Sequence, residues 1–253
     1  MKFPIDIHIG SGTIPSHFVL EVLGFFVAFI YFLYLSKKKS DPLSENHRWF
    51  VILGGAFGAL IGSRLIAALE RPYLFFHPPS ILFYYENQTI VGGLIGALVG
   101  VEIIKKILKE KKRSGDLFVY PLILGMIIGR VGCFLTGVKD DTVGLPSRLP
   151  WAFDQGDGIP RHPTSLYEIL FLIILWIALY QLAKRVSIKN GVLFRLFIFS
   201  YATFRFFIEF IKPIQPIALG LSAIQITCVC ILLYYKINFI VHKLSRPAII
   251  SKV

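Results

Sequence analysis

The chain has 253 residues, of which 55% are hydrophobic and only 17% are charged, and its mean hydropathy is +0.67. A soluble domain of this length needs more polar surface to cover itself, so the composition excludes an ordinary soluble protein. The formal net charge of +12 would also suit a nucleic-acid-binding protein. Here, however, the basic residues stand in short runs beside apolar blocks, which favours membrane topology and anionic lipid head groups over nucleic acid.

The apolar residues form blocks of about 20, roughly the length a helix needs to cross ~30 Å of hydrocarbon. Before them, Ile5, Ile7 and Ile9 alternate with polar residues, which predicts a short extended or interfacial arm. We therefore expect an all-α integral membrane protein whose single transmembrane domain covers residues 1–253. Seven transmembrane helices are expected at His17–Ser36, Trp49–Leu69, Thr89–Ile107, Leu117–Thr136, Ser165–Ala183, Gly191–Phe210 and Ala218–Ile240.

The distribution of positive charge predicts the orientation. Seventeen lysines and arginines follow the first, third and fifth expected helices or lie in the C-terminal tail, against six on the opposite side. By the positive-inside rule, the N-terminus is outside and the C-terminus is cytoplasmic. Residues 137–164 then form an ordered outer-face loop, and long ordered loops often carry function. Its carboxylates match no calcium-binding spacing, and we predict no metal or other cofactor.

Glycines recur at four-residue spacing in three expected helices, which predicts close helix packing. The pairs are Gly58 with Gly62, Gly96 with Gly100, and Gly125 with Gly129. Gly92 and Gly93 lie at the outer end of the third expected helix. There, two glycines would also let a ligand head group approach the backbone.

Ionisable side chains within the apolar blocks are the clearest functional signal, because each costs roughly 2.5–3.5 kcal/mol at the bilayer centre. They are Glu21, Arg64, Glu102, Arg130, Arg205 and Glu209. Arg205 and Glu209 are four residues apart and can neutralise each other on one helix. Arg64 and Glu102 can pair between helices. Arg130 still needs an anion, and a lipid phosphate is the natural candidate, because guanidinium binds phosphate in a bidentate manner.

Four further residues have structural interpretations that compete with functional ones. Ser165 and Glu168 form a capping-box pattern at the start of the fifth expected helix, which favours a structural role. His162, just before it, is a candidate base, although a lone histidine is more often a hydrogen-bonded structural residue. Cys133 lies one helical turn from Arg130, and a packing role is favoured over a covalent one.

An ordered set of short motifs covers nearly the whole chain. In chain order they are Gly62-Ser63-Arg64, Gly92-Gly93-Leu94-Ile95-Gly96, Asp116, Gly129-Arg130-Val131-Gly132-Cys133-Phe134, Arg161-His162-Pro163, Leu166-Tyr167-Glu168, Tyr201-Ala202-Thr203-Phe204-Arg205, Glu209 and Gln225. Together they resemble the prolipoprotein diacylglyceryl transferase family. The resemblance implies a multi-pass enzyme of the bacterial inner membrane. Such enzymes transfer the diacylglyceryl group of phosphatidylglycerol to the lipobox cysteine of a prolipoprotein.

The resemblance also implies roles for individual residues. Arg130 and Arg205 would hold the phosphate, and Tyr201 and Glu209 would orient Arg205 or the head group. Positive charge at this position would stabilise the leaving phosphate while the thiolate attacks the glycerol carbon. Substrate-binding roles are implied for Arg64, Gly92, Gly93, Cys133, Gly144, Arg161, His162 and Tyr167.

The chain departs from the family pattern on the acceptor side. Val91 stands where the family usually has a histidine, and Cys133 stands where it has an asparagine. The acceptor is therefore either a lipobox cysteine or another nucleophile. The alternative function is a non-catalytic relative that binds or transports anionic phospholipid. A small-anion channel is disfavoured, because no broken-helix inverted repeat is visible.

Overall fold

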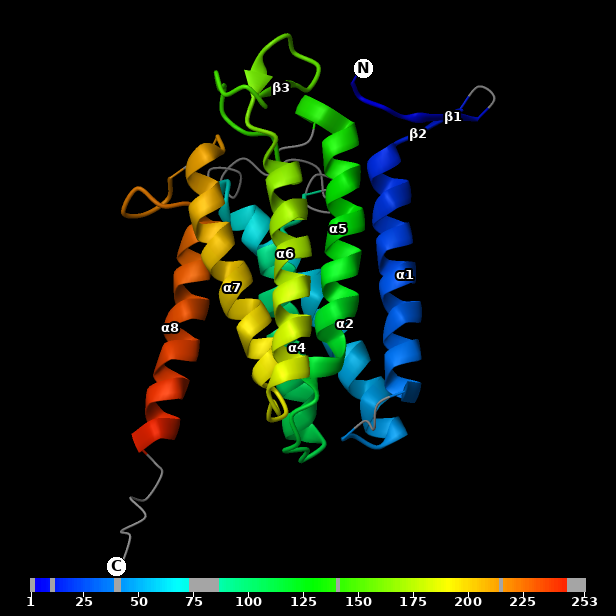
Figure 1. The fold of residues 1–253 in the computed structure, drawn as a ribbon, viewed down its shortest axis with the longest axis vertical. Helices are drawn as coiled ribbons and strands as arrows, with labels where there is room; N and C mark the ends of the chain where they lie inside the picture. Colours follow the sequence, from blue (N-terminus) through cyan, green and yellow to red (C-terminus); the bar gives the residue numbers. More distant parts are fainter. Residues whose placement is uncertain are drawn as a thin grey trace, which may run out of the picture.

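The computed structural model describes residues 3–9, 12–38, 42–72, 87–139, 142–213 and 216–244, with side chains as far as Lys236. Within these ranges, one α-helix coincides with each apolar block, and the seven helices gather in one bundle (Figure 1). They are α1 (Ser16–Lys38), α2 (Glu45–Leu69), α4 (Ile90–Ile107), α5 (Val119–Thr136), α6 (Thr164–Arg185), α7 (Val192–Ile208) and α8 (Ala223–Leu244). The last helix begins five residues later than expected, because Ala218–Ser222 form a turn.

Four described stretches are long and apolar enough to cross a membrane: α1, α2, α6 and the continuous segment Gly115–Lys139 around α5. At most 44% of the apolar window of any of them is buried. Large apolar side chains are strongly exposed on their surfaces, as at Phe25 (71%) and Ile61 (65%). Such continuous exposed apolar surface is typical of helices that face lipid. The helical membrane class is therefore as predicted, whereas the number of crossings and their direction stay predictions.

The packing of α2 against α4 depends on glycine. A methyl group on Gly58 would collide with the backbone carbonyl of Gly96, and one on Gly62 with that of Gly92. The two backbones are thus in direct contact, as the four-residue spacing predicted. On α5, Gly125 similarly faces Gly24 of α1, but nothing lies within 4 Å of a methyl group placed on Gly129.

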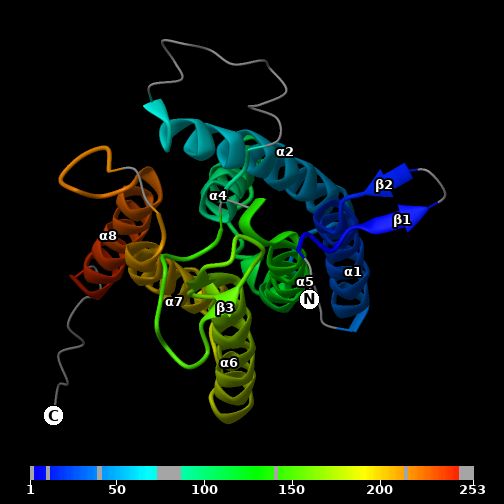
Figure 2. The ribbon, with the colours of Figure 1, turned by 90° about the horizontal axis from the view of Figure 1, so that it is seen from above.

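Helix α5 occupies the middle of the bundle. Seen from above, α1 lies on one side of it and α6 and α7 on the other (Figure 2). Its buried residue Ile123 shares the main core with Leu172 of α6, Phe197 of α7 and Val91 of α4. This arrangement brings α5, α6 and α7 together around the same interior space.

Two helix starts are fixed by polar side chains from the predicted motifs. Asp116, in the 3₁₀ turn η2 (Gly115–Phe118), accepts hydrogen bonds from the backbone N–H groups of Gly191 (2.6 Å) and Phe194 (2.8 Å) at the start of α7. At the start of α8, Ser222 accepts from the N–H of Gln225 (3.1 Å), and the Gln225 side chain accepts from the N–H of Ser222 (3.0 Å). This reciprocal pair is a capping box, so Asp116 and Gln225 stabilise helix termini.

The N-terminal arm and the loop after α5 lie at the end of the bundle that we predict to face outside, and the hairpin of the arm projects sideways beyond α1 (Figures 1 and 2). The arm forms a hairpin of β1 (Ile7–Ile9) and β2 (Gly12–Ile14), and the loop contains the 3₁₀ turn η3 (Gly137–Lys139) and the strands β3 (Phe153–Asp154) and β4 (Pro160–Arg161). The Phe3 ring packs edge-on against Phe134 (5.8 Å between centroids) and Phe153 (5.9 Å). Phe3 thus ties the start of the arm to the end of α5 and to β3, and the outer-face position of the loop stays a prediction.

Candidate active site

The carboxylate of Glu168, on α6, is the centre of a buried polar cluster. It lies 2.9 Å from the Nε of Arg130 on α5, and it accepts hydrogen bonds from Arg205 (3.3 Å) and the Tyr201 hydroxyl (2.7 Å) on α7. Glu168 is 2% exposed. A buried carboxylate surrounded by two guanidinium groups and a phenol is well compensated. Three of the four residues predicted to be catalytic therefore converge on a residue that was not predicted.

The interpretation of Glu168 as a capping residue is wrong. The N-cap position of α6 is Pro163, and no side chain caps this terminus. Glu168 instead turns inward, while the Ser165 hydroxyl lies 3.3 Å from that of Thr142 in the preceding loop. The sequence already held the relevant signal, because Glu168 is a carboxylate inside an apolar block.

A second carboxylate, Glu209, extends the cluster beyond the end of α7. It opens the 3₁₀ turn η4 (Glu209–Ile211), accepts a hydrogen bond from Arg205 (2.7 Å) and lies 3.6 Å from the Nζ of Lys212. The predicted pairing of Arg205 with Glu209 is confirmed. Lys212 is 7% exposed, and its burial lowers the pKa of the amine. The sequence-based analysis missed this residue because it lies two positions beyond the expected end of the helix.

The cluster combines three basic and two acidic side chains. Arg130, Arg205 and Lys212 face the two carboxylates of Glu168 and Glu209. Glu70, at the end of α2, accepts a hydrogen bond from the N–H of Ile224 (2.7 Å). Burial raises the pKa of the Glu70 carboxyl. Guanidinium groups bind phosphate as well as carboxylate, so Arg130 and Arg205 have the chemistry to bind an anionic head group.

Cys133 also belongs to this cluster. The Nη1 of Arg130 lies 3.5 Å from its sulfur atom, and Cys133 is 8% exposed. The three cysteines of the chain are free thiols. Cys133 is therefore a small buried side chain in contact with a guanidinium group.

The predicted residues of the outer loop form a network of their own. The Tyr167 hydroxyl lies 3.3 Å from the Nδ1 of His162 and accepts a hydrogen bond from the indole of Trp151 (2.7 Å). A methyl group on Gly144 would collide with the His162 backbone, so glycine is required there. Arg161 binds Asp157 through two nitrogens (2.9 and 2.5 Å), and its hydrogen bonds lower the pKa of that carboxyl.

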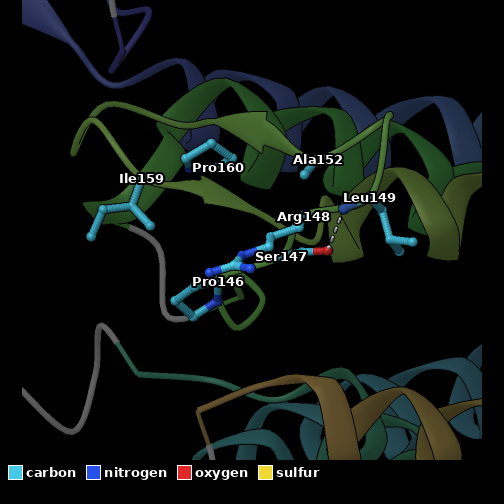
Figure 3. A pocket seen from close by; sticks show the side chains of 7 residues that line it. All are labelled: Pro146, Ser147, Arg148, Leu149, Ala152, Ile159 and Pro160. Atoms are coloured by element: carbon cyan, nitrogen blue, oxygen red, sulfur yellow. Dashed lines mark hydrogen bonds between the residues drawn. The ribbon is translucent and has the colours of Figure 1, made fainter.

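This outer loop is tied to the charged cluster. The N–H of Leu145 donates to the carbonyl of Ile211 (2.8 Å) in η4, and Thr164 on α6 donates to the carbonyl of Thr142. Beyond Leu145, the loop encloses a pocket of about 500 Å³ (Figure 3). The pocket is lined by Pro146, Ser147, Arg148, Leu149, Ala152, Ile159 and Pro160. It is largely apolar, with Arg148 as the charged side chain in its wall.

The remaining predicted residues, Arg64, Gly92 and Gly93, lie where α2 meets the start of α4. Arg64 donates to Ser63 (2.9 Å) and Gln88 (3.3 Å), and Gln88 in turn donates to Glu21 of α1 (2.5 Å). Gly92 is fixed by packing, whereas a methyl group on Gly93 would have no neighbour nearer than 3.7 Å. This side chain network links α1 and α2 to the start of α4.

The hypothesis that Arg64 pairs with Glu102 is wrong. Gly62, two residues before Arg64, packs against Gly92, and Glu102 lies ten residues further along α4, or about 15 Å at the helical rise. Glu102 instead lies 3.5 Å from Lys105 on its own helix.

The geometry defines a class of protein: a helical membrane protein with a cluster of charged side chains buried between its helices. Residues 4–241 match the model of the family described as prolipoprotein diacylglyceryl transferase. The chain is 31% identical over 243 residues to the phosphatidylglycerol–prolipoprotein diacylglyceryl transferase of Methylobacillus flagellatus, with 87% of this chain and 88% of the relative covered. It is 31% identical over 240 residues to that of Idiomarina loihiensis, with 87% and 85% covered. The chain belongs to the prolipoprotein diacylglyceryl transferase family.

Proposed function

We propose that the protein transfers the diacylglyceryl group of phosphatidylglycerol to the cysteine thiol of a prolipoprotein lipobox, or to a related acceptor, at the bacterial inner membrane. In this proposal, the seven helices all cross the membrane, and the N-terminus lies outside. The observation that carries the proposal is the convergence of Arg130 and Arg205 on the single carboxylate of Glu168.

In the proposed reaction, the thiolate sulfur forms a bond to a glycerol carbon, and the bond from that carbon to the phosphate oxygen breaks. Glycerol phosphate leaves with the electron pair, so negative charge grows on the oxygen that departs. Arg130 and Arg205 supply fixed positive charge, which stabilises the transition state more than the ground state. Tyr201 and Glu209 act through Arg205 and Glu168. The Tyr201 hydroxyl donates to Glu168, and Glu209 accepts from Arg205 and lies 3.6 Å from the Nζ of Lys212.

The remaining predicted residues surround this centre. Arg64 and the open side of Gly93 would contact the lipid on the side of α2 and α4, and Gly144 and Arg161 would hold the outer loop in place. His162 is our candidate for the group that takes the thiol proton, because Val91 has no ionisable side chain. Its contact with Tyr167 (3.3 Å) would orient the imidazole ring.

The test measures transfer of a radiolabelled diacylglyceryl group from phosphatidylglycerol to a lipobox peptide in lipid nanodiscs. Arg130→Gln and Arg205→Gln should each lower the rate by about 10²–10³-fold, the loss typical when one donor to a developing anion is removed. The matched control is Arg185→Gln, which neutralises an exposed arginine at the other end of α6 and should leave the rate unchanged. Equal rates in all three variants would refute the proposal.

The second candidate function is binding or transport of anionic phospholipid without chemistry. It is favoured by one observation: Val91 is 2% exposed and packs in the apolar core, so this position offers no proton acceptor. It predicts that the unsubstituted protein binds phosphatidylglycerol and that Arg205→Gln weakens this binding, while no labelled peptide forms. Rescue of a transferase-deficient bacterium by this gene would exclude it.

A further inference from the structure

The connection between α7 and α8 ends in a tight turn with a leucine at its tip. The N–H of Ile217 donates to the carbonyl of Leu221 (2.9 Å), and the N–H of Leu221 donates to that of Ala218 (2.9 Å). The tip residues, Leu219 and Gly220, both have positive φ angles, of 54° and 73°. Glycine adopts this conformation without steric cost, whereas a leucine adopts it only at a steric cost.

Leu219 is also 97% exposed, the highest value among the exposed large apolar residues that the structure describes. In water, this turn would combine an unfavourable backbone conformation of leucine with an almost fully hydrated leucine side chain. A polar residue such as asparagine would suit an aqueous tip on both counts. The same leucine is favourable if the tip lies in an apolar phase.

The position of the turn indicates that this apolar phase is the lipid bilayer. Residues 216–221, in orange, project sideways from the ends of α7 and α8 in both views, whereas the segment with β3 stands above the helices (Figures 1 and 2). Apolar side chains before and within the turn are exposed: Phe207 (64%) on α7, Phe210 (50%) in η4 and Ile217 (40%) in the turn. Exposed apolar side chains are thus found on the turn as well as on the helices that face lipid.

The sequence around the turn excludes strong attraction to a charged partner. From Pro213 to Tyr235 the chain has no lysine, arginine, histidine, aspartate or glutamate. Along the chain, the nearest ionisable residue before the turn is Lys212, which is buried against Glu209. A sideways apolar projection without charge matches the interface between head groups and acyl chains of the surrounding bilayer.

We propose that residues 216–221 are a lipid anchor, with Leu219 inserted among the acyl chains of the membrane leaflet at the outer ends of α7 and α8. The anchor fixes the position of η4 relative to the membrane surface, because only residues 212–215 lie between η4 and the turn along the chain. This inference does not depend on the transfer reaction, so it can be tested whether or not the protein catalyses that reaction.

The experiment replaces Leu219 with tryptophan and measures fluorescence in phosphatidylglycerol vesicles, with and without lipids brominated on their acyl chains. The parent protein supplies the emission of its three native tryptophans, which is subtracted. The added tryptophan should have blue-shifted emission and lose intensity with brominated lipid. The matched control is Ile159→Trp, since Ile159 is equally apolar, is 41% exposed and lies in the outer loop.

Red-shifted emission at position 219 that aqueous iodide quenches and brominated lipid does not would overturn the proposal. Equal quenching of both variants by brominated lipid would also overturn it, because the effect would then not be specific to the turn. If Leu219→Trp elutes as aggregate in gel filtration, Ile217→Trp provides the same measurement two residues away. The same two quenching patterns then support or refute the anchor.

Discussion

The α2–α4 pair and the group of α5, α6 and α7 are held together in different ways. In the first, Gly58 and Gly62 bring two backbones into contact, so the interface has a single geometry. In the second, Arg130, Arg205 and Glu168 join three helices through charges that lie 2.9–3.3 Å apart. A carboxylate that pairs with an arginine can be replaced by an anionic ligand, whereas no ligand can replace a direct contact between two backbones. The difference explains why the proposed chemistry lies in the charged group and why the glycine pair provides the fixed support.

The largest effect is expected from breaking the charged group. Glu168→Gln removes the carboxylate that Arg130 and Arg205 share, and loss of one partner of a buried ion pair costs about 3–5 kcal/mol. The thermal unfolding midpoint in detergent should therefore fall. Glu102→Gln is the matched control, because the Glu102 side chain is 67% exposed and lies 3.5 Å from Lys105 on its own helix. An unchanged midpoint for Glu168→Gln would mean that the cluster does not stabilise the bundle.

A smaller loss is expected from the glycine pair. Gly96→Ala places a methyl group against the Gly58 carbonyl, and overpacking of this kind costs about 1–3 kcal/mol. For a chain of this length, the midpoint should fall by roughly 2–4 °C for each kcal/mol. Gly129→Ala adds the same methyl group to α5 where nothing lies within 4 Å, and its midpoint should stay at that of the parent protein. Equal shifts in both variants would contradict the packing argument.

The smallest effect is expected outside both groups, in the outer loop. Arg161 lowers the pKa of Asp157 below its ordinary value of 3.8, so the pair stabilises the folded loop above that pH. The stabilisation is lost as pH falls through the lower pKa of the folded state. Asp157→Asn should therefore speed hydrogen exchange of the amides near β4 at pH 7, relative to their intrinsic rates. The difference between variant and parent should vanish in strong acid, and a difference that grows with acidity would contradict the assignment.

The sequence by itself determined the helices. Blocks of apolar residues of membrane-spanning length produce helices in any environment without water, because backbone groups there must pair within the segment. It also determined which residues carry charge into the interior, since Arg130 and Arg205 stand out against their apolar neighbours. The pairing of Arg205 with Glu209 followed from helical periodicity alone.

Only the tertiary structure decided which of these charges meet. Glu168 lies 38 residues after Arg130 and 37 before Arg205, and no local periodicity relates positions on three different helices. Its pattern with Ser165 suited a helix cap, but the true capping box formed at Ser222 and Gln225. Likewise, Gly125 and Gly129 share one spacing, yet only Gly125 has a neighbour at its surface. Spacing along a helix fixes which face a residue occupies, and the packing of the other helices decides what that face contacts.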